Sequence, residues 1–229
     1  YGGDGTVLDV ATILYKTEIP LVIIPGGTAN IMAKELGIST TIATALKIFD
    51  KKIKTKKIDV SLLNKKIPMF LRIEAGILAD MVTNTPREQK DSLGLLAYPV
   101  SAVQEMRKAE PVKYILNLDG KKIKTEGVAL MIANSANIGI TGVSIQKSVN
   151  CFDGILDVFV LQSTDIGTLF SIGTSTLTGR KKPTTLKHWK AKKITAKISP
   201  KQTVICDDSS LDLSKLKVSI SPYKLSVLV

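Results

Sequence analysis

Two glycine-rich turns, each followed by a helical pattern, constrain the fold of this chain more than any other feature. "GGDGT" occupies residues 2–6 and "PGGTAN" occupies residues 25–30. The second turn directly follows "PLVII", a short apolar run typical of a buried parallel strand. Because the carboxyl ends of neighbouring parallel strands meet at one edge of an open α/β sheet, the pair of turns predicts a shared crevice there.

This crevice has the properties of a phosphate-binding site. Glycines let the backbone approach a phosphate closely, and the N-terminus of a helix presents unpaired N–H groups to an anion. Asp4 stands where a metal ion or a sugar hydroxyl could be bound. An aspartate at the start of a helix is also compatible with a plain N-cap, so both interpretations stay open.

The pattern of the chain changes near residue 52. Before it, helical patterns at residues 6–16, 29–38 and 40–49 alternate with the turns. The third pattern repeats apolar residues at helical spacing: Ile42, Ala45, Leu46 and Phe49. Residues 1–51 therefore predict the C-terminal half of a doubly wound α/β nucleotide-binding domain.

After that point the pattern is β. Alternating runs flank Asp119-Gly120, a strong hairpin signal, and further strand patterns continue to the end of the chain. Helical patterns interrupt them at residues 93–106 and 165–179. We expect residues 52–229 to form an antiparallel β-sandwich or barrel domain that receives the substrate, with a return of the last residues to the first domain left open.

Charge points to an anionic partner. The chain has 32 Lys and Arg against 20 Asp and Glu, a net charge of +12, and only 5% aromatic residues. Few aromatics leave little for base stacking, so we expect an anionic membrane surface and no nucleic acid. Many lysines alternate with apolar residues, which is also typical of the solvated face of a strand. No apolar run reaches the roughly 20 residues of a membrane span, and we expect a cytoplasmic protein.

The cysteines and the single histidine carry no metal pattern. Cys151 and Cys206 are far apart and have no histidine partner at metal-ligand spacing, so we expect buried thiols. We expect His188 to help frame the strand beside Trp189.

The two turns also resemble the catalytic domain of the diacylglycerol kinase family, in its bacterial-type branch, whose fold is distantly shared with NAD kinases. The similarity continues through "IEAGILADMV", "REQKDSLGLLAYPVSAVQEM", "DGILDVFVL" and "HWKAKKITAKISPKQTVICDD", in the family's order and over essentially the whole chain. NAD kinases lack a Gly-Thr-Ala-Asn turn of this form and resemble the chain less.

The resemblance implies an ATP-dependent lipid kinase that uses Mg²⁺ and transfers the γ-phosphoryl of ATP to the hydroxyl of diacylglycerol or a related lipid. Asp4 is implied to be catalytic. The implied nucleotide-binding residues are Gly2, Gly3, Gly5, Thr6, Gly27, Thr28 and Asn30. Family members begin with elements ahead of GGDGT, so roughly 60 to 80 residues of the α/β half are expected to be missing here. The fragment itself is not expected to be active.

Two positions depart from the family pattern. Ile31 stands where many members have Asp, and Ser209 stands where the family has the glutamate that acts as general base. A serine hydroxyl needs a base of its own to accept a proton at neutral pH. Either Asp207 or Asp208 substitutes for the glutamate, or catalysis is weak or lost; "CDDSS" is equally compatible with a polar turn between strands.

A structural Mg²⁺ site is implied in "NCFDGILD". Asn150, Asp153 and Ile155 occupy the matching positions, although a neutral Asn weakens a site for a hard cation and a plain turn is the alternative. Arg87 and Lys90 match basic positions that could meet phosphate or anionic lipid, or could simply be solvated.

Three functions therefore remain to be distinguished. The first is a lipid kinase peripheral to the membrane, the second is an inactive or weak lipid- and nucleotide-binding member of the family, and the third is a kinase of a soluble alcohol. Ser209 favours the second. The sequence leaves homodimer formation open.

Overall fold

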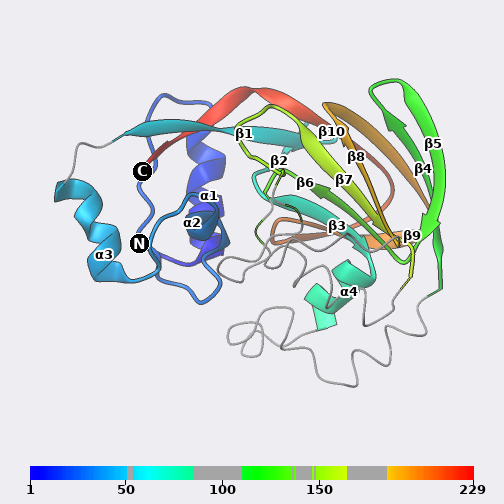
Figure 1. The fold of residues 1–229 in the computed structure, drawn as a ribbon, viewed down its shortest axis with the longest axis horizontal. Helices are drawn as coiled ribbons and strands as arrows, with labels where there is room; N and C mark the ends of the chain where they lie inside the picture. Colours follow the sequence, from blue (N-terminus) through cyan, green and yellow to red (C-terminus); the bar gives the residue numbers. More distant parts are fainter. Residues whose placement is uncertain (51–53, 85–109, 136, 138–145, 147, 164–184) are drawn as a thin grey trace.

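The computed structural model describes residues 1–50, 54–84, 110–135, 137, 146, 148–163 and 185–229. A small helical part carries both glycine turns, and a large β part lies beside it (Figure 1). The expected fold class, an α/β part followed by an antiparallel sandwich, is confirmed. The expected boundary falls in residues 51–53, outside the described residues, and stays a prediction.

The helical part contains α1 (Asp4–Leu14), α2 (Ile31–Glu35), α3 (Ile42–Leu46) and the 3₁₀ turn η1 (Lys47–Asp50). Helix α1 buries Leu8 and Ala11, which lie three residues apart and so share one face. Gly37 follows α2 with a φ of +72°, a conformation in which a residue without Cβ ends a helix at little cost.

Two elements of this part differ from the sequence patterns. Residues 20–24 form no strand: Leu21 makes an isolated parallel bridge to Val227, and buried and half-buried residues alternate along the run. In α3 and η1 only Ala45 of the predicted apolar face is buried, whereas Ile42, Leu46 and Phe49 are 44%, 46% and 56% exposed. The helical period is correct, but the described residues put no neighbouring element over that face.

The β part begins with β1 (Thr55–Leu63), β2 (Ile67–Met69) and β3 (Arg72–Gly76), followed by the helix α4 (Ile77–Asn84). The strands β4 (Val112–Leu118), β5 (Lys121–Gly127), β6 (Ala129–Ala133) and β7 (Leu156–Leu161) come next. The last three are β8 (Leu186–Ala191), β9 (Lys193–Cys206) and β10 (Ser209–Leu228). The sequence patterns missed α4 and β8, and the helices expected at 93–106 and 165–179 lie outside the described residues, as do Arg87 and Lys90.

All the strand pairs are antiparallel, in the order β2-β1-β10-β9-β3-β6-β7-β8, and β4 joins β5 to the first half of β9. The long strands β9 and β10 therefore belong to both layers of the sandwich. The first half of β9 pairs with β4 and with residues 215–219 of β10. The second half of β9 pairs with β3 and with residues 209–213 of β10, beside the Cys206–Ser209 turn. Buried side chains of both layers form one core that includes Tyr114, Leu130 and Leu216.

The end of β10 links the two parts. Leu21 donates its N–H to the carbonyl of Ser226 (2.8 Å) and accepts from the N–H of Leu228 (3.0 Å). Leu225 and Val227 accordingly pack in the same cluster as Leu8 and Ala11 of α1. Because β9 and β10 also reach the turn between Cys206 and Ser209, the same hairpin that anchors the helical part carries the acidic turn.

Candidate active site

The two glycine turns lie against each other. The N–H of Gly2 donates to the carbonyl of Ile24 (3.2 Å), and the N–H of Gly26 donates to the carbonyl of Gly2 (2.8 Å), which makes a parallel bridge. A methyl group added at Gly27 would lie 2.6 Å from the Cα of Gly3, closer than real contacts allow. The crossing of the turns therefore requires glycine, and the first turn of α1, which has no side-chain cap, begins at the crossing.

Asn30 closes the second turn from inside. It adopts a left-handed conformation with φ +46° and is buried. Its Oδ1 accepts from the N–H of Gly27 (3.0 Å), and its Nδ2 donates to the carbonyl of the same residue (2.5 Å). The side chain thus fixes the shape of the turn, so its predicted part in nucleotide binding would be to present the backbone of the turn.

Asp4 is the N-terminal cap of a helix other than its own. Its Oδ1 accepts from the N–H of Ile31 (2.6 Å) and from the N–H of Met32 (3.4 Å), the first residues of α2. Burial raises the pKa of Asp4, although these amide donors favour the charged form. The N-cap alternative placed Asp4 at the helix that follows it, whose N-cap is instead Gly3. The carboxylate binds a helix 27 residues along the chain and ties the first turn to the helix that follows the second.

Asp207 holds the acidic turn of the β9–β10 hairpin against the start of β3. Its two oxygens accept from three backbone N–H groups, those of Phe70 (2.8 Å), Leu71 (3.0 Å) and Arg72 (2.8 Å). Its own N–H donates to the carbonyl of Arg72 (2.9 Å). Burial raises the pKa of Asp207 to about 6 against the opposing effect of the three donors. With its oxygens so occupied, Asp207 fixes the direction of its neighbour.

Asp208 is that neighbour, and it faces the first glycine turn. Its Oδ2 lies 3.6 Å from the position a methyl group at Gly5 would take, and its side chain is exposed. The hydroxyl of Ser209 donates to Asp208 Oδ1 (3.4 Å). Carboxylates from the two ends of the chain, Asp4 and Asp208, therefore flank Gly5.

A polar network that sequence reasoning missed joins α2 to the acidic turn. Glu35 Oε2 accepts from the hydroxyl of Ser135 (2.7 Å) and from the N–H of Asn137 (3.0 Å), and the carbonyl of Asn137 accepts from Arg72 Nη1 (2.8 Å). The buried Asn134 donates through Nδ2 to the carbonyl of Phe70 (2.9 Å). The only signal in the sequence is the polar run "NSAN" directly after an apolar strand.

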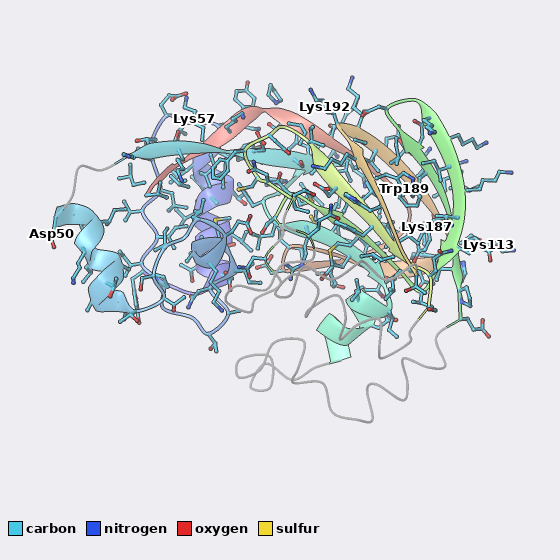
Figure 2. All side chains as sticks on the ribbon, viewed as in Figure 1. Asp50, Lys57, Lys113, Lys187, Trp189 and Lys192 are labelled. Carbon is cyan, nitrogen blue, oxygen red and sulfur yellow. The ribbon has the colours of Figure 1, made fainter. Side chains whose placement is uncertain are left out.

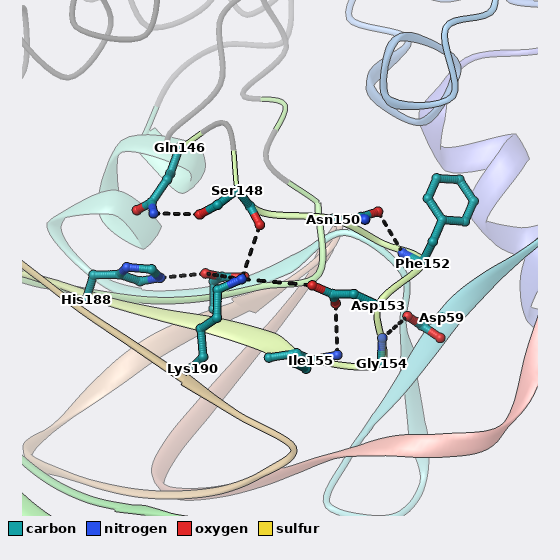
Figure 3. Close-up of polar contacts among 11 residues, drawn as sticks. Asp59, Gln146, Ser148, Asn150, Phe152, Asp153, Gly154, Ile155, His188 and Lys190 are labelled. Atoms are coloured by element: carbon teal, nitrogen blue, oxygen red, sulfur yellow. Dashed lines mark hydrogen bonds and ion pairs between the residues drawn. The ribbon is translucent and has the colours of Figure 1, made fainter. Parts of the chain in front are cut away.

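The residues predicted to hold a structural Mg²⁺ form a turn (Figure 3). Asn150 Oδ1 accepts from the N–H of Phe152 (3.1 Å), and Asp153 Oδ1 accepts from the N–H of Ile155 (3.0 Å). The other Asp153 oxygen lies 3.9 Å from the ammonium of Lys190, which competes with a cation for it. This set does not fit a hard dication well, and among the described residues no cluster of three acidic, His or Cys side chains could hold a metal ion.

His188 lies at the opposite end of the close-up from Asp59 (Figure 3). Its Nε2 is 2.5 Å from Oδ1 of the fully buried Asp157, and its ring stacks on Phe159 with centroids 4.5 Å apart. The ammonium of Lys190 is 3.8 Å from the same oxygen. These contacts hold β8 on β7. Both cysteines are buried and free, as expected.

Comparison with known proteins places this geometry in a family. The sequence profile of the diacylglycerol kinase catalytic domain matches residues 1–63, and the profile of the YegS C-terminal NAD kinase beta sandwich-like domain matches residues 72–229. The chain belongs to the diacylglycerol kinase family of lipid kinases. The expected family resemblance is thereby confirmed.

Relatives within the diacylglycerol kinase family differ in length from this chain. An uncharacterized protein of Synechocystis, sll0036, is 33% identical over 99% of this chain and 53% of its own length. The diacylglycerol kinase of Bacillus subtilis is 27% identical over 78% of this chain and 59% of its own length. The chain thus spans about half the length of the curated relatives it matches.

Solved structures agree with the diacylglycerol kinase assignment. A structure from Bacillus anthracis str. Sterne, provisionally named a diacylglycerol kinase, is 30% identical and has a TM-score of 0.81 over 98% of this chain and 75% of its own. An NAD kinase from Archaeoglobus fulgidus, at 14% identity and a TM-score of 0.51 over 99% of this chain and 74% of its own, shares the fold alone. Among the described residues, no helix is long and apolar enough to cross a membrane.

Proposed function

We propose that the protein carrying this chain is an ATP-dependent lipid kinase that phosphorylates the hydroxyl of diacylglycerol or a related lipid. One observation supports this most: the acidic turn of the β part lies beside Gly5 of the first glycine turn. A phosphoryl transfer needs a phosphate cradle and a proton acceptor in the same place, and these two turns supply both kinds of group.

The cradle consists of the crossed turns and the open N-terminus of α1. Gly2, Gly3 and Gly27 give the close backbone crossing, and the uncapped first turn of α1 offers N–H groups to phosphate oxygens. Gly5, Thr6, Thr28 and Asn30 complete the proposed nucleotide-binding set.

Asp208 is the proposed proton acceptor in place of the family glutamate. It is exposed beside Gly5, and the Ser209 hydroxyl donates a hydrogen bond to one of its oxygens. As the lipid hydroxyl oxygen bonds to the γ-phosphorus and the bond to ADP breaks, Asp208 takes the hydroxyl proton. Asp207 acts as a positioning residue, since three amides occupy its carboxylate.

Asp4 is the residue that would hold a Mg²⁺ ion, because its carboxylate lies at the start of the phosphate cradle, and Asp208 is thereby left to act as the base. The ion would neutralise charge on the phosphates when bound. The second site at Asn150, Asp153 and Ile155 stays a prediction, and no step depends on it. Cytoplasmic location, peripheral membrane association and homodimer formation likewise stay predictions.

The test is transfer of labelled phosphate from ATP to a panel of lipids by the longest gene product that contains this chain. We expect Asp208→Asn to lower the rate by about 100-fold or more, as loss of a general base does. Asp212→Asn, an exposed acid on the same hairpin, is the matched control and should keep the wild-type rate.

The alternative is a lipid- and nucleotide-binding protein without effective catalysis, favoured by Ser209. It predicts no transfer by the wild type and a gain of transfer in Ser209→Glu. Transfer only to water-soluble alcohols would instead replace the lipid by a soluble substrate.

A further inference from the structure

One face of the sandwich, formed by β5, β4, the first half of β9 and part of β10, presents lysines to solvent. Inward residues such as Tyr114, Ala196 and Leu216 are buried, so every second residue of these strands points outward. The outward lysines, all exposed, are Lys113, Lys122, Lys124, Lys193, Lys197, Lys215 and Lys217. We call this set the basic face.

Strand register places these lysines next to one another. Ile115 pairs with Lys124 on one side and with Lys197 on the other, and Lys197 pairs directly with Lys215. A row across four strands therefore reads Lys, Ile, Lys, Lys. Like charges directly opposite on neighbouring strands destabilise a sheet, so this row opposes folding unless an anion lies on it.

In the part of the chain that the structure describes, the basic face has almost no acidic residues to balance its lysines. No lysine of the set forms an ion pair with any residue that the structure describes. Glu126, opposite Lys113, is the single acidic residue at the outward positions of the paired segments. Figure 2 shows Lys113 at the outer margin of the sandwich, where further nitrogen-tipped side chains extend away from β4 and β5.

The shape and chemistry of the basic face favour a bilayer over a nucleic acid. The face is a sheet surface without arginine or aromatic residues at its outward positions, so it lacks both the bidentate fork that reads phosphates individually and the rings that stack on bases. A hollow of about 500 Å³ on this face is lined by Ile115 together with Lys113, Lys197 and Lys215. Point charges beside an exposed isoleucine suit the headgroup layer of anionic phospholipids.

We propose that the basic face is the surface by which the protein binds an anionic phospholipid bilayer, with the row Lys124, Lys197 and Lys215 at its centre. The choice of a lipid surface as partner rests on the proposed lipid kinase function. The binding itself needs neither ATP nor phosphate transfer, so it is measured separately.

The experiment compares two triple variants of the full-length protein for co-sedimentation with vesicles of phosphatidylglycerol in phosphatidylcholine. Lys124→Gln, Lys197→Gln and Lys215→Gln together should weaken binding about a hundredfold, at roughly fivefold for each lysine near an anionic surface. The control triple, Lys16→Gln, Lys47→Gln and Lys66→Gln, removes the same net charge from exposed positions elsewhere and should weaken binding far less.

A thermal melt separates this effect from misfolding. Because the central triple variant loses a like-charge pair, its melting temperature should equal or exceed that of the wild type. A lower melting temperature would contradict the argument from strand register.

Other outcomes overturn the proposal. Equal losses in both triple variants would mean that net charge alone drives binding. Binding to a DNA duplex or to RNA that depends on the central lysines, with no binding to vesicles, would assign the face to nucleic acid.

The two proposals can fail separately. If the wild type transfers no phosphate but the central triple variant still loses vesicle binding, the basic face is upheld and only the kinase function is refuted.

Discussion

At the scale of single residues, the crossing of Gly3 and Gly27 gives the sharpest test of the glycine turns. We predict that Gly27→Ala lowers the free energy of unfolding by about 3 kcal/mol, because its methyl group would lie 2.6 Å from the Cα of Gly3 and backbone must move to make room. Nucleotide binding should fall with it. Chemical denaturation measures the first effect, and titration with an ATP analogue measures the second.

Gly5→Ala is the matched control for that substitution. Its methyl group would lie 3.6 Å from Asp208 Oδ2, an ordinary contact, and position 5 is already helical. Stability should stay within about 0.5 kcal/mol of the wild type. Equal destabilisation by both substitutions would mean that the turns do not cross as described.

Asp207 should give the protein a distinctive dependence on pH. Its pKa of about 6 in the folded state lies above the ordinary value of 3.8. Above pH 6 the carboxylate is ionised in both states, and the cost of burying its charge is fully present. Between those two values the folded state binds the proton more tightly, so the free energy of unfolding should rise as the pH falls.

The measurement for Asp207 is the difference in unfolding free energy between the wild type and Asp207→Asn across this pH range, which cancels the titration of other acids. If the three amide donors outweigh burial, the folded-state pKa lies below the ordinary value, and the difference shrinks with acid instead of growing.

The sequence predicts some of these residues and hides the others for a physical reason. Glycines in a turn can be recognised in the sequence because they determine the local backbone conformation. The pattern therefore predicts that Gly3 and Gly27 lie in turns. The three amides that bind Asp207 lie about 135 residues away along the chain, and every residue except proline has the same N–H. A pattern of side chains in the sequence therefore cannot identify which backbone N–H groups bind Asp207.

At the scale of elements, the contact of α2 with the β part decides how the nucleotide turn is held. Asp4 binds the first residues of α2, and Glu35 at its last residue binds Ser135 and Asn137. A five-residue helix is not stable alone, so these end contacts fix its direction.

We predict a coupling energy of about 1–2 kcal/mol between Glu35 and Ser135, because the charged acceptor meets a buried hydroxyl 2.7 Å away. Glu35→Ala, Ser135→Ala and the double variant, unfolded with urea, form the cycle. Glu35→Gln keeps an acceptor oxygen and should recover part of the loss. A coupling energy near zero would show that the helix is held by its apolar contacts alone.

Elements differ in how far the sequence predicts them. The β4–β5 hairpin follows from Asp119-Gly120, since both residues adopt the positive φ, +50° and +95°, that a two-residue turn needs. The apolar face of α3 follows equally well from its period, yet Ile42 and Phe49 are exposed. Periodicity reports which residues could be buried, while burial also requires a neighbouring element at the right place.

At the scale of the whole molecule, the β9–β10 hairpin connects three regions: the basic face, the acidic turn and the contact with the helical part. Strands β9 and β10 carry Lys197 and Lys215 in the basic face, Asp207 and Asp208 in the acidic turn, and the β10 end that binds Leu21. Two cores fix these parts: the sandwich core includes Cys206 and Leu216, and a second cluster packs Leu225 and Val227 of β10 against Leu21.

Net charge should also act on the molecule as a whole. With 32 basic against 20 acidic residues, repulsion among exposed lysines opposes the folded state, and the exposed ion pairs Lys57–Glu18 and Lys201–Asp212 contribute little against it. Raising NaCl from about 20 mM to about 300 mM shortens the range of these interactions to several ångströms, so the melting temperature should rise by about 2–4 °C. In the variant that lacks Lys124, Lys197 and Lys215 the rise should be smaller, because part of the repulsion is already gone. A melting temperature that falls with salt would mean that attraction between opposite charges, such as Lys224 with the buried Asp59, outweighs repulsion among the lysines.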